Sequence, residues 1–357
     1  MGLNEDFWHN KKVLLTGHTG FKGSWLLLLL IKLNAKVVGY ALPPETKPNL
    51  FMELELNIKN KFINNFGDIR DKKNLHAIVN ETKPDIVFHL AAQPLVRMSY
   101  QKPLETWDIN VMGTLNLLDS LKDLNKKCAV VVVTTDKVYF NREWEYSYRE
   151  NDLLGGFDPY SASKAATEIA LSSWRSSFCG TKEYQTNFLS ISSARSGNVI
   201  GGGDWSLDRI VPDAIRALSL NNKIMVRNPK STRPWQHVLD PLVGYIMLAE
   251  NLLSKEDFPK EAFNFGPYND SNKNVSELLK EIFKYWKGEI MKKENPDDFH
   301  EANLLNLQID KAYSYLNWKP NWNFEETVKK TTLWYKNYNS GKDPYSLCSN
   351  DIDDFLD

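Results

Sequence analysis

Cysteine is scarce in this sequence. Three cysteines occur in 357 residues (Cys128, Cys179 and Cys348); they are odd in number and far apart. Such spacing suits neither a disulfide framework nor a structural zinc site, and it is typical of a protein in the reducing cytosol. No cluster of His, Asp or Glu has metal-ligand spacing either. We therefore expect a cytoplasmic protein that binds no metal.

Long hydrophobic runs and an excess of one charge are also missing. The longest apolar run, residues 25–31, lies between Lys22 and Lys32 and is far shorter than the about 20 residues of a membrane span. It also follows a glycine-rich turn, which is unlike a signal peptide. Forty-four Lys and Arg against 45 Asp and Glu leave a net charge of −1. Because no global basic field results, we expect neither nucleic acid nor a membrane as a partner.

What the sequence does contain is a regular alternation of strands and helices. Its length favours two lobes, and 42% hydrophobic residues suffice for a folded core. We expect strands at 12–16, 36–40, 62–66, 86–90, 129–134 and about 186–192. Between them we expect helices at 22–33, 72–80, 107–124 and about 161–176. This order predicts an α/β fold with a doubly wound, Rossmann-type parallel sheet, whose ligands bind at the carboxyl ends of the strands.

The composition changes after about residue 195, where glycine, proline and tryptophan become frequent. We interpret residues 1–194 as a dinucleotide-binding domain and residues 195–357 mainly as a smaller, mixed substrate-binding lobe. The chain is expected to return to the first domain at about 239–253.

A glycine-rich turn follows the first predicted strand. Residues 16–23 read T-G-H-T-G-F-K-G, with the glycines spaced G-x-x-G-x-x-G. Glycines allow close backbone approach, and the following helix directs its N-terminus at a pyrophosphate. The alternative is an ordinary tight turn, but the position in a β-α-β unit favours dinucleotide binding. The candidate residues are Gly17, Thr19, Gly20, Phe21, Lys22 and Gly23.

The preference between NAD and NADP is open from the local residues. An acidic residue that would hold the ribose of NAD is expected about 20 residues after the turn. Residues 39–42 read G-Y-A-L, and no arginine there indicates NADP.

Tyr160 and Lys164 are four residues apart and so share one helix face. A nearby cation and an oxidised nicotinamide would lower the phenol pKa from about 10. The phenolate could then accept a hydroxyl proton while hydride leaves the same carbon. Thr135, after the valine-rich strand, could orient the substrate oxygen, while Asp136 and Lys137 add two ionisable groups that simple alcohol oxidation does not need. The alternatives are surface residues of an amphipathic helix and a solvated turn.

Five motifs together resemble the sugar-nucleotide 4,6-dehydratase branch of the extended short-chain dehydrogenase/reductase family, and within it the group acting on CDP-glucose. They are T-G-H-T-G-F-K-G-S-W-L (16–26), H-L-A-A-Q-P-L-V-R (89–97), T-T-D-K-V-Y (134–139), R-S-G-N-V-I-G-G-G-D-W (195–205) and R-P-W-Q-H-V-L (233–239). The resemblance covers nearly the whole chain.

The resemblance implies an NAD-dependent reaction in three stages. The C4 hydroxyl is oxidised with Tyr160 as base, water is eliminated across C5 and C6, and the stored hydride returns to C6. In the wider branch an Asp donates a proton to the leaving hydroxyl and a following Glu is the C5 base. Here Asp136 matches the acid, but Lys137 replaces the Glu. Lys137 would be a base only with a lowered pKa, and otherwise would stabilise the enolate by its charge.

The resemblance also implies further contacts. Cofactor contacts fall on Asp68 and Ile69 near the adenine, on Ala91, Ala92 and Gln93 near the ribose and phosphates, and on Thr134, Tyr160 and Lys164 near the nicotinamide. Substrate contacts fall on Gln93, Arg97, Thr135, Asn198, Arg209, Arg233 and Trp235. Of these, Arg233 and, more weakly, Arg209 would clamp the pyrophosphate, and Trp235 is a candidate for base stacking. Asp68 could instead be a helix N-cap, and Arg233 a surface ion pair.

Assembly and alternative activities complete the expectations. The family suggests a homodimer or homotetramer that pairs through helices near 104–125 and 160–178. The alternatives are a 4,6-dehydratase for dTDP-glucose or GDP-mannose, a C4-epimerase or reductase on the same scaffold, and a non-catalytic dinucleotide-binding redox sensor. Asp136 and Lys137 argue against the epimerase, and an intact Tyr160 and Lys164 argue against the sensor.

Overall fold

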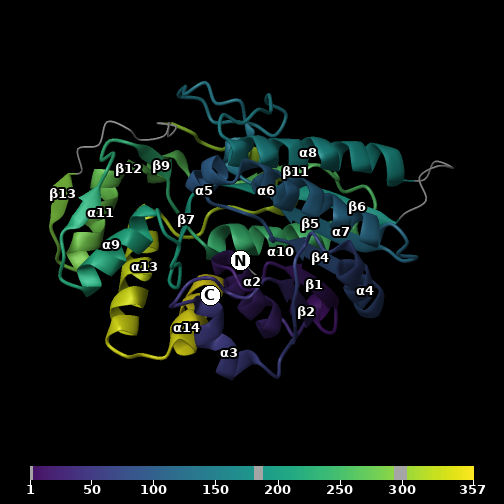
Figure 1. The fold of residues 1–357 in the computed structure, drawn as a ribbon, viewed down its shortest axis with the longest axis horizontal. Helices are drawn as coiled ribbons and strands as arrows, with labels where there is room; N and C mark the ends of the chain where they lie inside the picture. Colours follow the sequence, from purple (N-terminus) through teal and green to yellow (C-terminus); the bar gives the residue numbers. More distant parts are fainter. Residues whose placement is uncertain (1–2, 181–187, 293–303) are drawn as a thin grey trace.

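The protein is described by a computed structural model that covers residues 3–180, 188–292 and 304–357. Its centre is a seven-stranded sheet in which every neighbouring pair is parallel (Figure 1). The spatial order of the strands is β11 (Ala262–Phe265), β6 (Leu189–Ser196), β5 (Cys128–Val133), β4 (Ile86–His89), β1 (Lys12–Thr16), β2 (Lys36–Ala41) and β3 (Ile63–Phe66). The predicted doubly wound α/β fold is confirmed.

Helices cover both faces of the sheet because its strands are apolar on both sides. In β5, Ala129, Val131 and Val133 belong to one apolar cluster, whereas Val130 and Val132 belong to a second. This alternation is the period-two geometry of a strand buried on both faces. The first face is covered by α2 (Phe21–Lys32), α3 (Leu50–Ile58) and α10 (Leu239–Ser254). The second is covered by α4 (Lys72–Thr82), α7 (Gly113–Leu121) and α8 (Pro159–Phe178).

Two predicted elements differ from the observed ones. The helix predicted at 107–124 consists of α6 (Pro103–Trp107), the π-helical η1 (Asp108–Met112) and α7, which ends at Leu121. Strand β6 begins at Leu189 and continues to Ser196, whereas the predicted strand ran from about 186 to 192. Residues 186 and 187 of that prediction lie outside the described residues. The serines of β6 interrupt the apolar pattern, but backbone pairing with β11 extends to Ser196.

The part of the chain after β6 is mixed in structure. Its helices are α9 (Ile210–Ser219), α11 (Val275–Tyr285), α12 (Asp310–Leu316), α13 (Phe324–Asn339) and α14 (Pro344–Leu356). Three two-stranded sheets pair β7 (Val199–Ile200) with β10 (Gln236–His237), β9 (Thr232–Pro234) with β12 (Asn272–Asn274), and β8 (Ile224–Val226) with β13 (Ile290–Lys292). Helix α10 packs on β5 and β6, and β11, which was not predicted, joins the sheet.

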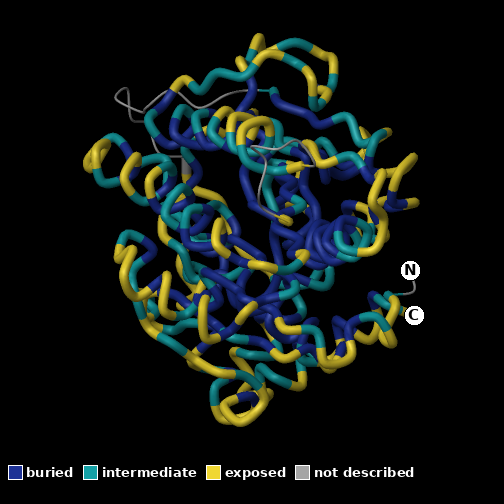
Figure 2. Tube along the Cα trace, turned by 90° about the vertical axis from the view of Figure 1, so that its right-hand side faces the viewer, coloured by how far each residue is buried: buried dark blue, intermediate teal, exposed yellow. Residues whose placement is uncertain are grey.

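One apolar cluster runs from the first face of the sheet into α9, α11, α13 and α14. Buried residues therefore form a continuous interior, with exposed residues along the outer loops (Figure 2). The division at residues 194 and 195 stays a prediction. The remaining short helices are α1 (Glu5–Trp8), α5 (Val96–Gln101), η2 (Asp136–Val138) and η3 (Asn269–Ser271). Within the described ranges, no helix has the length and apolar character needed to span a bilayer.

Candidate active site

One cavity of about 1220 Å³ follows the carboxyl ends of β1, β2, β3, β4, β5 and β6. Every residue predicted above to contact cofactor or substrate, or to take part in the chemistry, lines it. They are Gly17, Thr19, Gly20, Phe21, Lys22, Gly23, Asp68, Ile69, Ala91, Ala92, Gln93, Arg97, Thr134, Thr135, Asp136, Lys137, Tyr160, Lys164, Asn198, Arg209, Arg233 and Trp235. Tyr160 and Asp136 therefore open into the same space, as a single substrate would require.

The glycine turn forms a close-fitting cradle at the start of α2. Gly17 has φ +77°, and a Cβ there would lie 2.6 Å from the Ala91 nitrogen. A Cβ on Gly23 would lie 2.0 Å from the Gly17 carbonyl oxygen. Gly20 is the N-cap of α2, and a Cβ there would lie 3.5 Å from the Gly17 carbonyl oxygen, at ordinary contact distance. The N–H groups of the first helical turn are thus available to an anion, and the cradle fits a dinucleotide pyrophosphate.

Lys22 leaves this turn towards the reacting end of the cavity. Its Nζ donates a hydrogen bond of 2.7 Å to Ser196 Oγ at the end of β6. Burial lowers the Lys22 pKa to about 7, helped by the charges of Arg209 and Lys164 and opposed by Asp136. Lys22 was predicted from the motif as a cofactor residue, and its proximity to Asp136 was not foreseen.

At the opposite end, Asp68 is held by an arginine that sequence reasoning missed. The Asp68 carboxylate accepts hydrogen bonds from Arg70 Nε (3.0 and 3.1 Å) and Nη2 (2.6 Å), which lower its pKa. Asp68 is not the N-cap of α4, because Asp71 caps that helix by accepting from the Asn74 N–H. Arg70 also lines the cavity, so the wall predicted to contact the adenine contains an ion pair and not Asp68 alone.

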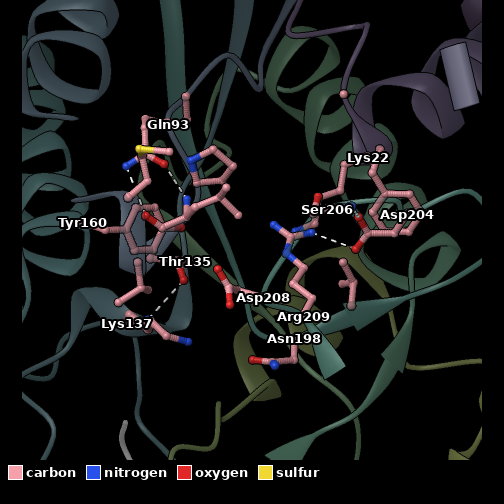
Figure 3. Close-up of a pocket in the computed structure, with 18 of the residues that line it drawn as sticks. Lys22, Gln93, Thr135, Lys137, Tyr160, Asn198, Asp204, Ser206, Asp208 and Arg209 are labelled. Carbon is pink, nitrogen blue, oxygen red and sulfur yellow. Dashed lines mark hydrogen bonds and ion pairs between the residues drawn. The ribbon is translucent and has the colours of Figure 1, made fainter. Parts of the chain in front are cut away.

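Tyr160 stands in the first turn of α8. Asp158 caps the helix by accepting from the Ser161 N–H (2.9 Å) and hydroxyl (2.6 Å), and Pro159 is its first residue. The Tyr160 side chain hydrogen-bonds Thr135, and Figure 3 shows the two together on one side of the pocket, facing Asp208 and Arg209.

Burial raises the pKa of Tyr160 to about 12, and the hydrogen bond with Thr135 and the charge of Arg209 oppose that effect. The predicted lowering involves an oxidised nicotinamide as well as a cation, so it stays a prediction. Lys164, one turn later, donates its Nζ to the Val133 carbonyl oxygen at 3.2 Å. Burial lowers the Lys164 pKa to about 8, and the carboxylate of Glu168 opposes that effect. The Tyr160 pKa is raised because burial outweighs the Thr135 hydrogen bond, and the charges of Asp136 and Asp158 raise it further.

Asp136 and Lys137 lie in the short helix η2. Thr135 caps it, accepting from the Lys137 N–H (3.3 Å) and donating to Asp136 Oδ1 (3.0 Å). The Asp136 side chain is buried, whereas that of Lys137 is 32% exposed, and their charged atoms are 3.9 Å apart. A Cβ on Gly197 would lie 2.8 Å from Asp136 Oδ2, so this glycine leaves room for the carboxylate.

The predicted substrate residues occupy the other wall. Arg209 pairs with buried Asp204 at 2.9 Å, and Figure 3 shows this pair across the pocket from Tyr160. Asp208 lies 3.7 Å from Arg97 and 3.3 Å from Arg227.

Two residues on this wall are held by the backbone. Arg233 donates from Nη1 to the Thr232 carbonyl oxygen. Trp235 is only 2% exposed and donates its indole N–H to the Lys273 carbonyl oxygen at 2.8 Å. Its predicted stacking role therefore lacks an exposed ring face.

Asn110 is a supporting residue that sequence reasoning missed. It lies in the π-helical η1, and its amide accepts from the Gln93 N–H (2.9 Å) and donates to Ser163 Oγ (2.9 Å). It thereby connects the loop after β4 with α8. A π-helical turn contains an extra residue, so the regular helical spacing of the sequence could not place Asn110.

Comparison with known proteins agrees with this geometry. A family model described as GDP-mannose 4,6 dehydratase matches residues 14–331. The chain is 43% identical over 357 residues to CDP-glucose 4,6-dehydratase of Salmonella typhimurium, covering 99% of this chain and 98% of that protein. The chain belongs to the nucleotide-sugar 4,6-dehydratase family. The UDP-glucose 4-epimerase of Lactobacillus helveticus is more distant from this dehydratase, at 23% identity over 92% of the chain and 98% of the epimerase.

Solved structures share the fold of the dehydratase. The dTDP-glucose 4,6-dehydratase of Bacillus anthracis in complex with NAD has a TM-score of 0.74 at 20% identity, over 93% of this chain and 98% of that one. The UDP-glucose 4-epimerase of Thermotoga maritima with UDP-glucose has a TM-score of 0.76 at 22% identity, over 91% and 99%.

Proposed function

We propose that this dehydratase converts CDP-glucose into CDP-4-dehydro-6-deoxyglucose and water, with NAD as a cofactor that is regenerated in each turnover. The observation that carries the proposal is that one cavity joins a phenol, a buried carboxyl group and an ammonium group to a glycine cradle. The choice of CDP-glucose is supported by the relative that is 43% identical over nearly the whole chain.

The cradle formed by Gly17, Gly20 and Gly23 would hold the cofactor pyrophosphate at the start of α2. When bound, NAD supplies an acceptor for the C4 hydride and returns that hydride to C6. The guanidinium of Arg70 is already matched by the Asp68 carboxylate, so it is poorly placed to bind the extra phosphate of NADP. This supports NAD.

The side chains of the cavity would then divide the proton transfers. Tyr160 accepts the proton of the C4 hydroxyl, and Thr135 holds the same oxygen. Oxidation at C4 acidifies the C5 proton. Lys137, 3.9 Å from Asp136, takes the C5 proton in its neutral form, and the resulting ammonium stabilises the enolate by its charge. Asp136 in its protonated form donates its proton to the C6 hydroxyl, which leaves as water.

We also propose that the protein is cytoplasmic and pairs with a copy of itself. The three cysteines are free thiols, which fits a reducing compartment. Exposed apolar side chains gather on α6, η1 and α8, which pack against one another. They are Leu104, Trp107, Met112 and Ile169.

The function is tested by incubating the purified protein and NAD separately with CDP-, dTDP-, UDP- and GDP-hexoses. We expect a 4-keto product, seen by its absorbance and by mass as loss of water, from CDP-glucose. In D₂O the product should carry deuterium at C5 and none at C6. Turnover of another nucleotide sugar but not of CDP-glucose would mean that the proposed substrate is wrong. A C4 epimer formed without loss of water would indicate an epimerase. NAD binding without any turnover would indicate a sensor.

A further inference from the structure

A buried ion pair between Glu168 of α8 and Arg195 of β6 lies behind the reacting end of the cavity. The Glu168 carboxylate accepts from Arg195 Nε (3.0 Å) and Nη2 (2.9 Å), and both side chains are almost completely buried. Neither residue lines the cavity. Because the pair does not reach the cavity, it can affect the reaction only by positioning the residues to which it is hydrogen-bonded.

Glu168 holds the beginning of the segment formed by residues 134–139. Its carboxylate accepts a hydrogen bond of 2.6 Å from Thr134 Oγ1 and another of 2.6 Å from Ser193 Oγ. With the two bonds from Arg195, both carboxylate oxygens are fully used. Short bonds to a buried charge are strong and directional, so they fix Thr134 against α8.

Arg195 holds the end of the same segment. Its Nη1 donates to the Tyr139 hydroxyl oxygen (2.8 Å) and to the Glu150 carbonyl oxygen (2.9 Å), and its guanidinium lies 5.0 Å from the centre of the Tyr139 ring. The Tyr139 hydroxyl in turn donates to Asn264 Oδ1 (2.7 Å), on β11. Tyr139 thus has one bond to the ion pair and one to the edge strand of the sheet.

Thr135, Asp136 and Lys137 lie between these two anchors. We propose that the Glu168–Arg195 pair is the positioning device of this segment, with Tyr139 as the link that sets the distance of Asp136 and Lys137 from the substrate. This inference rests on the proposed function, because the elimination of water is assigned to Asp136 and Lys137. Oxidation at C4 depends on Thr135, which directly follows the Thr134 anchor, and on Tyr160, which stands on α8, so loosening Tyr139 should affect elimination more.

Tyr139→Phe tests the link. The ring and its contact with Arg195 stay, and Arg195 Nη1 keeps the Glu150 carbonyl, so no charge is left without a partner. We expect kcat to fall about 10- to 100-fold with KM little changed, because a displacement of about 1 Å costs that much. In a single turnover, reduced nicotinamide should accumulate to a higher level than in the wild type, because elimination is delayed after oxidation.

Tyr148→Phe is the matched control. Tyr148 stacks on Tyr139 with ring centres 5.1 Å apart, but its hydroxyl contacts Arg142 and Asn141 and not the ion pair. It should turn over like the wild type. The melting temperatures of both variants show whether a lower rate reflects a general loss of stability or a displacement of residues 134–139 in a stable protein.

Amide hydrogen exchange gives a readout that needs no turnover. Exchange at residues 134–139 should rise in Tyr139→Phe and not in Tyr148→Phe. Unchanged exchange together with a wild-type elimination rate would overturn the proposal. If the wild type itself makes no 4-keto product from any nucleotide sugar, the proposed function fails, while the exchange comparison still decides whether Tyr139 anchors the segment.

Discussion

Tyr160 combines a raised pKa with a hydrogen bond to Thr135, and this combination suits a group that gives up its proton only when substrate and cofactor are in place. Its pKa of about 12 results first from burial, so the group is a phenol at neutral pH. A positive charge brought close to the phenol would stabilise the phenolate. The chemistry of the site would then depend on a ternary complex.

Tyr160→Phe should therefore abolish most of the turnover. We expect kcat to fall by about 10²- to 10⁴-fold, the usual contribution of a positioned acid or base. Binding of CDP, measured by calorimetry, should change little because the phenol is not among the charged groups of the cavity wall. Turnover near the wild-type rate would remove Tyr160 from the mechanism.

Asp136→Asn should separate oxidation from elimination. The amide cannot donate a carboxyl proton to the leaving hydroxyl, so reduced nicotinamide should accumulate after mixing with CDP-glucose, as measured by its absorbance. Asp208→Asn is the control, because Asp208 is a cavity carboxylate that pairs with Arg97 and Arg227. It should alter the affinity for CDP without accumulation. If Asp136→Asn eliminates water at the normal rate, the acid is another residue.

At the residue scale, sequence motifs identified groups that meet at strand ends, but not the groups that support them. Asp136 follows the carboxyl end of β5, and Tyr160 lies at the start of α8, the helix between β5 and the neighbouring strand β6. In a parallel sheet these two points lie at the same edge. Asn110 and Glu168 act through partners far away in the chain, and nothing in their local spacing shows those partners. Arg70 pairs with Asp68 two residues before it, but the sequence does not show that both side chains line the cavity. The local sequence does not show how deeply Tyr160 is buried, because burial is a property of the whole environment, so it could not predict the raised pKa of the phenol in the free protein.

At the scale of elements, the buried start of α10 joins the sheet to the C-terminal chain. Asp240 Oδ1 accepts from the Asn321 N–H at 2.6 Å, and the Asp240 carbonyl oxygen accepts from Trp318 Nε1 at 3.0 Å. Burial raises the Asp240 pKa from 3.8 to about 7. The folded protein therefore keeps this carboxyl group protonated where the unfolded chain would lose the proton.

This pKa predicts a pH dependence of stability. A carboxyl group whose pKa is raised on folding contributes stability that is complete below pH 3.8 and is lost as the pH rises through about 7. The contribution of Asp240 to the free energy of unfolding should fall by at most about 1.4 kcal/mol per pH unit over this range. Denaturant titrations from pH 5 to 8 should show a weaker dependence in Asp240→Asn than in the wild type. Equal slopes in the two proteins would contradict the assignment.

The ends of a strand could be predicted from the sequence only where the apolar pattern ends at the same residue as the backbone pairing with the next strand. β5 was predicted closely because its valines are buried on both faces. β6 was predicted too short because its serines read as a strand end, and β11 was not predicted because four residues carry little periodicity. The π-helical η1 was read as ordinary helix because its i→i+5 backbone hydrogen bonds, which distinguish it from an α-helix, leave no mark in the apolar spacing.

At the scale of the whole molecule, α8 connects the reaction site to the surface. One face carries Tyr160, Lys164 and Glu168, all buried, while Ile169 on the same helix is exposed. Covering the exposed apolar side chains of α6, η1 and α8 with a partner would bury part of α8 and so help to hold it in place. We propose above that a second copy of the chain covers these side chains.

Leu104→Glu tests this assembly. Leu104 is 84% exposed, so the substitution should leave the fold intact but place charge in an interface that must bury about 1,200 Å² or more to be stable. Sedimentation should show the wild type as a dimer or tetramer and the variant as a smaller species at the same concentration. Leu56→Glu is the control, because Leu56 is 82% exposed but lies on α3, which covers the other face of the sheet. A monomeric wild type, or equal assembly of all three proteins, would mean that this surface does not join copies of the chain.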